Sequence, residues 1–231
     1  DSTATTGVAT YTATVTNTSN SVEITKTFTG SANIPDMSEV EFTLYEVTAT
    51  GDVLVEAKTG TTGDNKITFK TLASGSYKLV ETKIPAGFVK SDDVEFKVLE
   101  DATIVETTST AATGDLNYTV SVENKANVVK VTKTFVGADA PDMSEVEFTV
   151  YEVTATGETA VIVAPGVTGV ATFEFNTFAP GTYKVVETKV PAGFAKDADV
   201  EFKVLDDGTI VAADSTATTG VATYTATVTN T

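Results

Sequence analysis

An internal repeat constrains this chain more than any other feature. Residues 35–43 return without change as 141–149, and residues 77–88 return as 183–194 with only two conservative changes. A repeat at this spacing indicates one structural unit that is encoded twice. The 231 residues of the chain therefore favour two domains of ordinary size over a single large one.

The predicted domains are residues 19–125 and 126–231, and a third, partial copy precedes them. Residues 1–18 are identical to residues 214–231, so we interpret them as a terminal strand stub that matches the end of a preceding repeat. Asn17 would then belong with a lysine of that repeat. We expect an array in which neighbouring repeats of the same protein are the partners. The alternative is head-to-tail strand exchange, in which 1–18 adds to the sheet of another chain.

Each repeat is predicted to consist of short β-strands rich in Val, Thr, Phe and Tyr and separated by Gly, Asp, Ser or Pro. In the first repeat the expected strands are 22–28, 40–47, 66–70, 76–82, 94–99, 103–106 and 117–124. One helical turn is expected at 36–39. This pattern favours an all-β fold of two tandem β-sandwiches. The linker 125–127 is too short for a flexible hinge, so we expect a stiff rod.

The composition excludes several classes of function. The chain has 32 acidic and 15 basic residues, a net charge of −17 and no arginine, which disfavours nucleic acid and phosphate ligands. It has no histidine and no cysteine, so Ser-His and Cys-His catalysis and disulfides are not available. No apolar run approaches the ~20 residues of a membrane span, so no membrane insertion is expected. The start, 1–4, does not read as a signal peptide, and we expect a mature fragment of a longer protein.

Polar residues occupy the apolar faces of three predicted strands in each repeat. In 22–28, Lys26 shares a face with three apolar residues, because side chains alternate between the faces of a strand. The same test predicts that each repeat aims one lysine, one glutamate and one asparagine inward. They are Lys26, Glu81 and Asn124 in the first repeat and Lys133, Glu187 and Asn230 in the second.

Three polar groups in an apolar core are costly unless they meet one another. Burial favours the neutral forms of amines and carboxyls, so a neutral amine and a protonated carboxyl can coexist at neutral pH. The amine can attack the asparagine amide carbon, while the carboxyl polarises the carbonyl and relays protons to the departing ammonia. The pattern therefore indicates a Lys-Asn side-chain amide that forms once in each domain.

These residues also resemble a known family, the Cna B-type (SpaA-like, prealbumin-like) isopeptide-forming domains of Gram-positive surface proteins and pilins. The resemblance covers both repeats. It is carried by the lysine of the first strand, the Glu-Phe-Thr-Leu-Tyr strand 41–45, the block 77–88 and the closing Val-Thr-Asn of 228–230. It implies that the two tandem sandwiches have the immunoglobulin-like/prealbumin-like fold.

For the inward residues the resemblance implies an intramolecular isopeptide bond between the first and last strands of each domain, with a glutamate as the catalytic acid. The implied bonds are Lys26–Asn124 and Lys133–Asn230, with Glu81 and Glu187 as catalysts. The first repeat departs from the family pattern by closing with Val-Glu-Asn, which does not change the reacting groups. A sortase sorting signal and a pilin-type lysine motif are not seen, so covalent polymerisation is not supported.

Simpler interpretations of the site stay open. The inward residues form an uncrosslinked hydrogen-bonded cluster, or the strand parity slips by one residue and they face solvent. The acidic pairs 92–93 and 206–207, with Asp64, offer a calcium site as an alternative. They lack the spacing of an EF-hand and are more often solvated loop tips, so we expect no metal and no cofactor.

The predicted function is a structural stalk or fibre repeat of a bacterial cell-surface adhesin, pilus or filament, located outside the cell at the surface or cell wall. The chain is not expected to be a turnover enzyme, because the reaction consumes its own residues once. The alternative is a ligand-binding adhesin module for a host protein or glycan, with the ligand unknown. The lack of tryptophan and the near-identity of the repeats suit spacing better than recognition.

Overall fold

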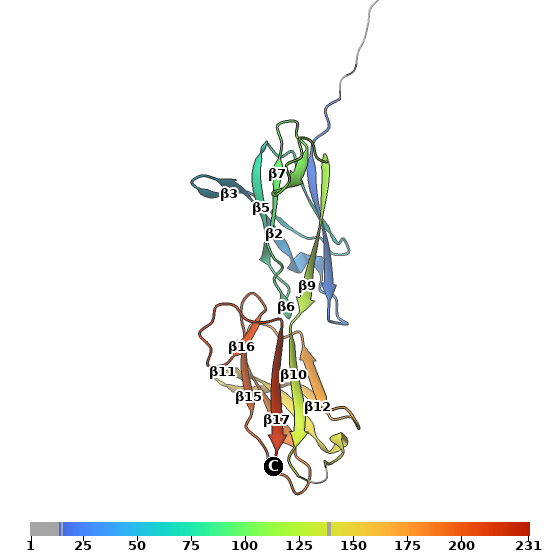
Figure 1. Cartoon of the computed structure of the whole chain (residues 1–231), viewed down its shortest axis with the longest axis vertical. Helices are drawn as coiled ribbons and strands as arrows, with labels where there is room; N and C mark the ends of the chain where they lie inside the picture. The colour runs from blue at the N-terminus through green and yellow to red at the C-terminus, as the bar shows by residue number, and fades with distance from the viewer. Residues whose placement is uncertain (1–13, 15, 138–139) are drawn as a thin grey trace, which may run out of the picture.

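The chain folds into two β-sandwiches that follow one another along the long axis (Figure 1). The computed structural model describes residue 14 and residues 16–137 and 140–231. The elements of the first sandwich are β1 (Ser21–Thr29), η1 (Met37–Glu39), β2 (Glu41–Thr48), β3 (Gly51–Thr59), β4 (Lys66–Lys70), β5 (Gly75–Lys83), β6 (Phe88–Val89), β7 (Val94–Val98), β8 (Ile104–Glu106) and β9 (Asn117–Ala126). Those of the second are β10 (Val128–Phe135), η2 (Met143–Glu145), β11 (Glu147–Thr154), β12 (Gly157–Pro165), β13 (Thr172–Asn176), β14 (Gly181–Lys189), β15 (Val200–Val204), β16 (Ile210–Ala212) and β17 (Thr223–Asn230).

Each sandwich pairs a small sheet with a five-stranded one. In the first, the orders are β4-β1-β9-β6 and β3-β2-β5-β7-β8, and in the second they are β13-β10-β17 and β12-β11-β14-β15-β16. The first and last strands of each domain are neighbours and run parallel, β1 beside β9 and β10 beside β17. The two ends of each domain therefore meet in one sheet, and the all-β prediction is confirmed.

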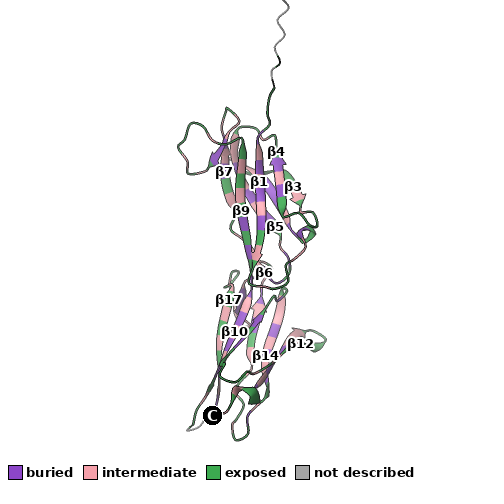
Figure 2. Cartoon of the chain, turned by 90° about the vertical axis from the view of Figure 1, so that its right-hand side faces the viewer, coloured by how far each residue is buried: buried purple, intermediate pink, exposed green. Residues whose placement is uncertain are grey.

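The apolar faces of the two sheets meet between the layers and form the core of each sandwich. Buried positions alternate with partly buried ones along core strands such as β1 and β5 (Figure 2), which is the pattern of a strand with one face toward the core and the other toward solvent. The first core is built from residues such as Val22, Ile24, Phe42, Leu44, Phe69, Leu79 and Phe96. The second uses their counterparts, among them Val129, Val131, Phe148, Val150, Phe175, Val185 and Phe202.

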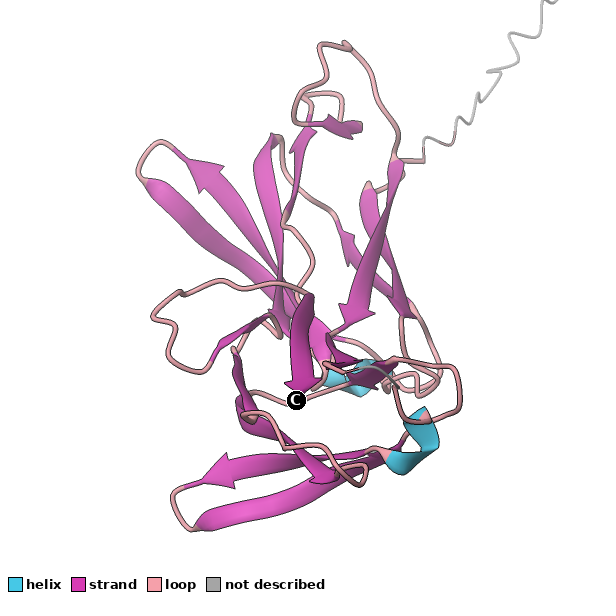
Figure 3. Cartoon of the chain, turned by 60° about the horizontal axis from the view of Figure 1, so that its bottom comes forward, coloured by secondary structure: helices cyan, strands magenta, loops and turns pink. Residues whose placement is uncertain are grey.

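The predicted strands of the first repeat are all present, with ends that differ by a few residues. Two strands were not predicted, β3 and β6. Nearly all of β3 is exposed, and it pairs only with β2, so its sequence carries no burial pattern. Figure 1 shows this hairpin projecting from the body. The expected helical turn at 36–39 is the 3-10 turn η1, in which the Asp36 carboxylate accepts a hydrogen bond from Ser38 N at 2.8 Å. Figure 3 draws the short helical turns in cyan among the strands.

The two domains are joined by a single residue, Asn127, between β9 and β10, so the prediction of a very short linker is confirmed. The boundary at 125/126 itself stays a prediction. The predicted stub 1–18 lies largely outside the described residues. Asn17 is described, and it is exposed and in no strand. Among the described residues, no helix has the length and apolar character needed to cross a membrane.

Candidate functional site

In each domain the inward lysine, glutamate and asparagine come together in the core. Lys26 lies on β1 and Asn124 on the neighbouring β9, where Asn124 pairs in register with Phe28. Glu81 lies on β5 of the opposite sheet. Exposed fractions are 2% for Lys26, 3% for Glu81 and 0% for Asn124. The sandwich thus closes a carboxyl from one sheet over an amine and an amide from the other.

The carboxylate of Glu81 contacts the nitrogens of both partners. Its Oε1 lies 3.5 Å from Lys26 Nζ, and its Oε2 accepts a hydrogen bond from Asn124 Nδ2 at 2.7 Å. Asn124 Nδ2 also donates to the carbonyl of Val89 at 2.7 Å. Asn124 Oδ1 is buried without a hydrogen-bond partner, although such an atom ordinarily finds one.

The second domain repeats this arrangement, with a shorter lysine–glutamate distance and a longer amide–glutamate hydrogen bond. Lys133, Glu187 and Asn230 are 1%, 4% and 0% exposed. Glu187 Oε1 lies 3.3 Å from Lys133 Nζ and accepts a hydrogen bond from Asn230 Nδ2 at 3.2 Å. Lys133 Nζ also donates to Asn230 Oδ1. The amine therefore touches the carbonyl that it would attack, and one carboxylate oxygen spans both nitrogens.

Burial weakens the basicity of both lysines. Desolvation lowers the pKa of Lys26 from its ordinary value of 10.5, and the Glu81 carboxylate opposes this shift. Desolvation likewise lowers the pKa of Lys133, opposed by Glu187 and Asp197. A depressed lysine pKa increases the fraction of neutral, nucleophilic amine at a given pH.

Aromatic rings cover each lysine. Lys26 Nζ lies 4.8 Å from the ring centre of Phe28, and Phe88 packs edge-on against that ring at 5.2 Å. Phe88 follows the turn 85–88, in which Phe88 N donates to the carbonyl of Pro85. The second domain has the same arrangement of Lys133, Phe135 and the Phe194 ring. The repeated Pro-Ala-Gly-Phe motif thus does more than form a turn, because its aromatic residue helps to close the site.

Position 91 and its counterpart 197 were not predicted as part of the site. In the first domain Ser91 Oγ accepts from Asn124 Nδ2 at 3.3 Å. In the second domain the residue is Asp197, whose Oδ2 accepts from Thr229 N at 2.8 Å. That bond, the bond from the N–H of Ala198 and the charge of Lys133 lower the pKa of Asp197. Both residues lie in a loop, where side chains do not alternate between two faces as they do in a strand. The alternation pattern of the sequence could therefore not identify them.

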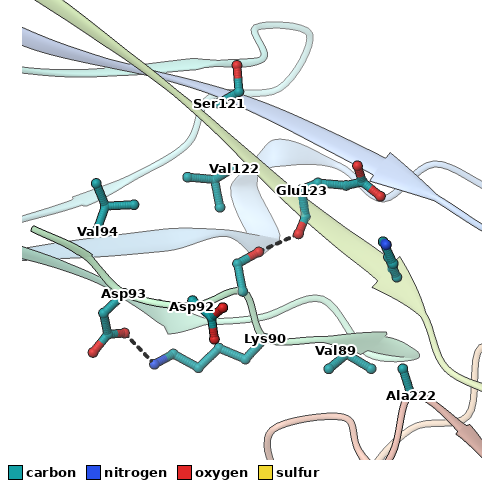
Figure 4. A pocket seen from close by; sticks show the side chains of 11 residues that line it. Val89, Lys90, Asp92, Asp93, Val94, Ser121, Val122, Glu123 and Ala222 are labelled. Carbon is teal, nitrogen blue, oxygen red and sulfur yellow. Dashed lines mark hydrogen bonds and ion pairs between the residues drawn. The ribbon is translucent and has the colours of Figure 1, made fainter.

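Ser91 also lines a surface groove of about 430 Å³. Figure 4 shows this groove between β9, with Val122 and Glu123, and the segment that carries Asp92 and Asp93. Ser91 also touches the buried amide of Asn124, so a single residue separates the groove from the triad.

Two of the acidic residues considered for calcium bond to other groups. Asp93 pairs with Lys90 at 2.8 Å, and Asp207 Oδ1 accepts from Thr209 N at 2.9 Å. Within the described parts of the chain, no three acidic side chains are grouped so that they would hold a metal ion.

The fold and the buried triads define a class of protein, tandem prealbumin-like β-sandwiches that bury lysine, glutamate and asparagine together. The model of the SpaA family, described as a prealbumin-like fold domain, matches residues 20–113 and 127–219. These matches cover most of the chain, which therefore belongs to the SpaA prealbumin-like fold domain family. This family is typical of surface proteins and pilins of Gram-positive bacteria. No curated protein matches the sequence.

Several solved structures are similar to this chain. The C-terminal fragment of the pilus adhesin SpaC from Lactobacillus rhamnosus GG aligns over 92% of this chain and 97% of its own, at 16% identity and a TM-score of 0.41. The shaft pilin SpaA of the same organism aligns over 93% and 98%, at 16% identity and a TM-score of 0.36. The Bacillus anthracis TIE protein aligns over 93% of this chain at 22% identity and a TM-score of 0.42, and this chain covers 34% of it.

Proposed function

We propose that each domain forms an intramolecular isopeptide bond, Lys26 to Asn124 and Lys133 to Asn230, and that the crosslinked domains serve as a structural stalk. The observation that carries this proposal is the position of the glutamate. In both domains its carboxylate touches the attacking lysine nitrogen and the leaving amide nitrogen. A group that contacts both nitrogens can move a proton between them.

The reaction balances without a co-reactant. The glutamate takes one proton from the lysine ammonium, and the neutral amine attacks the asparagine Cγ. The protonated carboxyl stabilises the developing oxyanion and returns its proton to the amide nitrogen. After the attack the lysine nitrogen still carries two protons, and it gives one of them to the regenerated glutamate carboxylate. The C–N bond to the amide nitrogen breaks, ammonia leaves, and a secondary amide remains beside a protonated glutamate. In the first domain the groove beside Ser91 offers ammonia a route to solvent.

The burial of unpartnered polar atoms favours this chemistry over a purely structural cluster. Asn124 Oδ1 in the first domain and Glu187 Oε2 in the second have no hydrogen-bond partner. Each such atom costs about 1–3 kcal/mol, and a buried ion pair is often no more stable than apolar residues of the same volume. A site selected only for stability has little reason to keep these groups.

The mechanical role follows from the topology. The bond would join two parallel neighbours at the two ends of the domain, so a pull on the terminal strands would pass through covalent bonds. This suits a stalk or fibre repeat of an extracellular adhesin, pilus or filament on the bacterial surface or cell wall. Neighbouring repeats of the same protein are the proposed partners, through an array or through strand exchange by residues 1–18.

Intact mass tests the proposal directly. Each bond removes one ammonia, so the chain is expected to weigh about 34 Da less than its sequence predicts when both bonds are present. The variant Glu81→Ala/Glu187→Ala should have the mass calculated from its own sequence, with no ammonia lost. It should also be cleaved faster by proteases. Peptide mapping should find Lys26 joined to Asn124 and Lys133 joined to Asn230. If the folded wild-type chain has the mass calculated for its uncrosslinked sequence, the proposal is refuted.

A further inference from the structure

The two domains meet at a joint whose hydrogen bonds are mostly between backbones. Lys90 N of the first domain donates to the carbonyl of Asp207 in the second at 2.8 Å. Asn127 N donates to the carbonyl of Gly87 at 3.0 Å, and Thr177 N donates to the carbonyl of Asn127 at 3.1 Å. Figure 2 shows β6 at this junction. These bonds connect the end of the first sandwich to two loops of the second.

Asn127 anchors those loops. It is fully buried, its Nδ2 donates to the carbonyls of Phe178 and Gly208, and its Oδ1 accepts from Phe178 N. Asn20 makes the equivalent bonds to Leu72 and Ala102 at the start of the first domain. The loop platform is therefore a feature of each domain.

Two glycines allow the first domain to sit on this platform. A Cβ at Gly87 would lie 2.6 Å from Thr177 Cα, and a Cβ at Gly208 would overlap the carbonyl oxygen of Phe88. Backbone atoms cannot yield as the end of a flexible side chain can. The two domains can therefore approach this closely only because neither position 87 in the first domain nor position 208 in the second carries a side chain.

Equivalent positions in the other domain separate this contact from backbone conformation. Gly193, the counterpart of Gly87, has almost the same φ, +88° against +87°, yet a Cβ there would meet nothing within 4 Å. Ala102, the counterpart of Gly208, holds a left-handed φ of 67° with its Cβ present. Alanine is thus compatible with the left-handed backbone at this position of the domain. Position 208 needs glycine because a Cβ there would collide with the neighbouring domain.

We propose that Gly87 and Gly208 form a steric key that docks the first domain on the second in one orientation, so that the pair moves as a single rigid unit. The partner that this surface fits is the end of a domain of the same kind, presented through the turn 85–88. The proposal is independent of the isopeptide bonds, since none of the joint contacts involves a triad side chain.

Three alanine variants of the full chain test the key. Gly87→Ala and Gly208→Ala approach the joint from opposite domains, and Gly193→Ala is the matched control for the strain of alanine at positive φ. Amide exchange by NMR reports the joint at Lys90 N. The interdomain distance distribution is measured between spin labels at Thr62→Cys and Thr168→Cys. The natural sequence has no cysteine, so only these two introduced residues are labelled.

In both joint variants we expect the Lys90 amide to exchange at least about tenfold faster, as local opening becomes easier, and the distance distribution to broaden. Gly193→Ala should leave both readouts at wild-type values. Core amides of β5 and β14 serve as the check that each domain stays folded. Equal effects of Gly87→Ala and Gly193→Ala on the Lys90 amide, or a narrow distance distribution in Gly208→Ala, would overturn the proposal.

Discussion

Removing both charges of the second triad gives the sharpest test of the crosslink. In the variant Lys133→Met/Glu187→Gln, methionine fills the volume of the lysine stem, and glutamine keeps an oxygen that can accept from Asn230 Nδ2. No charge is left unpaired in the core, so the usual penalty for breaking a buried ion pair does not arise. The remaining large effect on stability is the loss of the covalent bond.

The magnitude follows from the loop that the bond closes. Lys133 and Asn230 are 97 residues apart, and closing a loop of this length contributes roughly 4–5 kcal/mol by the chain-entropy argument used for disulfides. For a domain of ~100 residues, 1 kcal/mol shifts Tm by about 4–8 °C, so the second domain should melt roughly 20–35 °C lower. The first domain, which is unchanged, provides the internal reference.

Differential scanning calorimetry of the full chain, with intact mass on the same sample, measures this effect. The variant should lose one ammonia instead of two, and the thermal unfolding transition of its second domain should move to a lower temperature. If the triad is only an uncrosslinked cluster, the Tm of the second domain should stay the same or rise in the variant, because replacing a buried ion pair by uncharged residues is often neutral or stabilising. An unchanged or raised Tm in the variant would therefore refute the reasoning.

Three further predictions concern pH, force and the array. In Asn124→Ala, which cannot crosslink, burial lowers the pKa of Lys26 in the folded state, so the unfolded state binds more protons. Stability of the first domain should then rise with pH between the lowered value and 10.5, and a flat urea-midpoint profile there would contradict it. Under force, the second domain should not extend in the wild type. The uncrosslinked variant should release up to roughly 330 Å of chain, because Lys133 and Asn230 are 97 residues apart in sequence. Equal extension of the two proteins by force spectroscopy would exclude the bond. In a chain with 126–213 placed before residue 1, the added joint should be more mobile than the 125–127 joint because Ala102 carries a Cβ, and equal spin-label distance distributions at the two joints would disprove this.

The strands and the membership of the triads were predictable because they depend on local properties. A strand alternates its side chains with period two, so one misplaced Lys26 among apolar residues marks a buried amine wherever the strand lies. Strands such as β1, β4 and β5 also declare themselves by composition and by the turns around them. The exposed β3 gives no such signal, since neither of its faces enters the core.

The internal repeat and the alternation of its strands thus determined, from sequence alone, the two sandwiches and the six inward residues. Tertiary structure alone decided that Glu81 touches two nitrogens from the opposite sheet, that position 91 or 197 adjoins the triad, and that Gly208 is needed for its contact with another domain. Distances between sheets and between domains depend on register and packing across the whole chain. No local pattern records them, which is why two glycines of nearly equal conformation, at 87 and 193, differ only in what lies opposite.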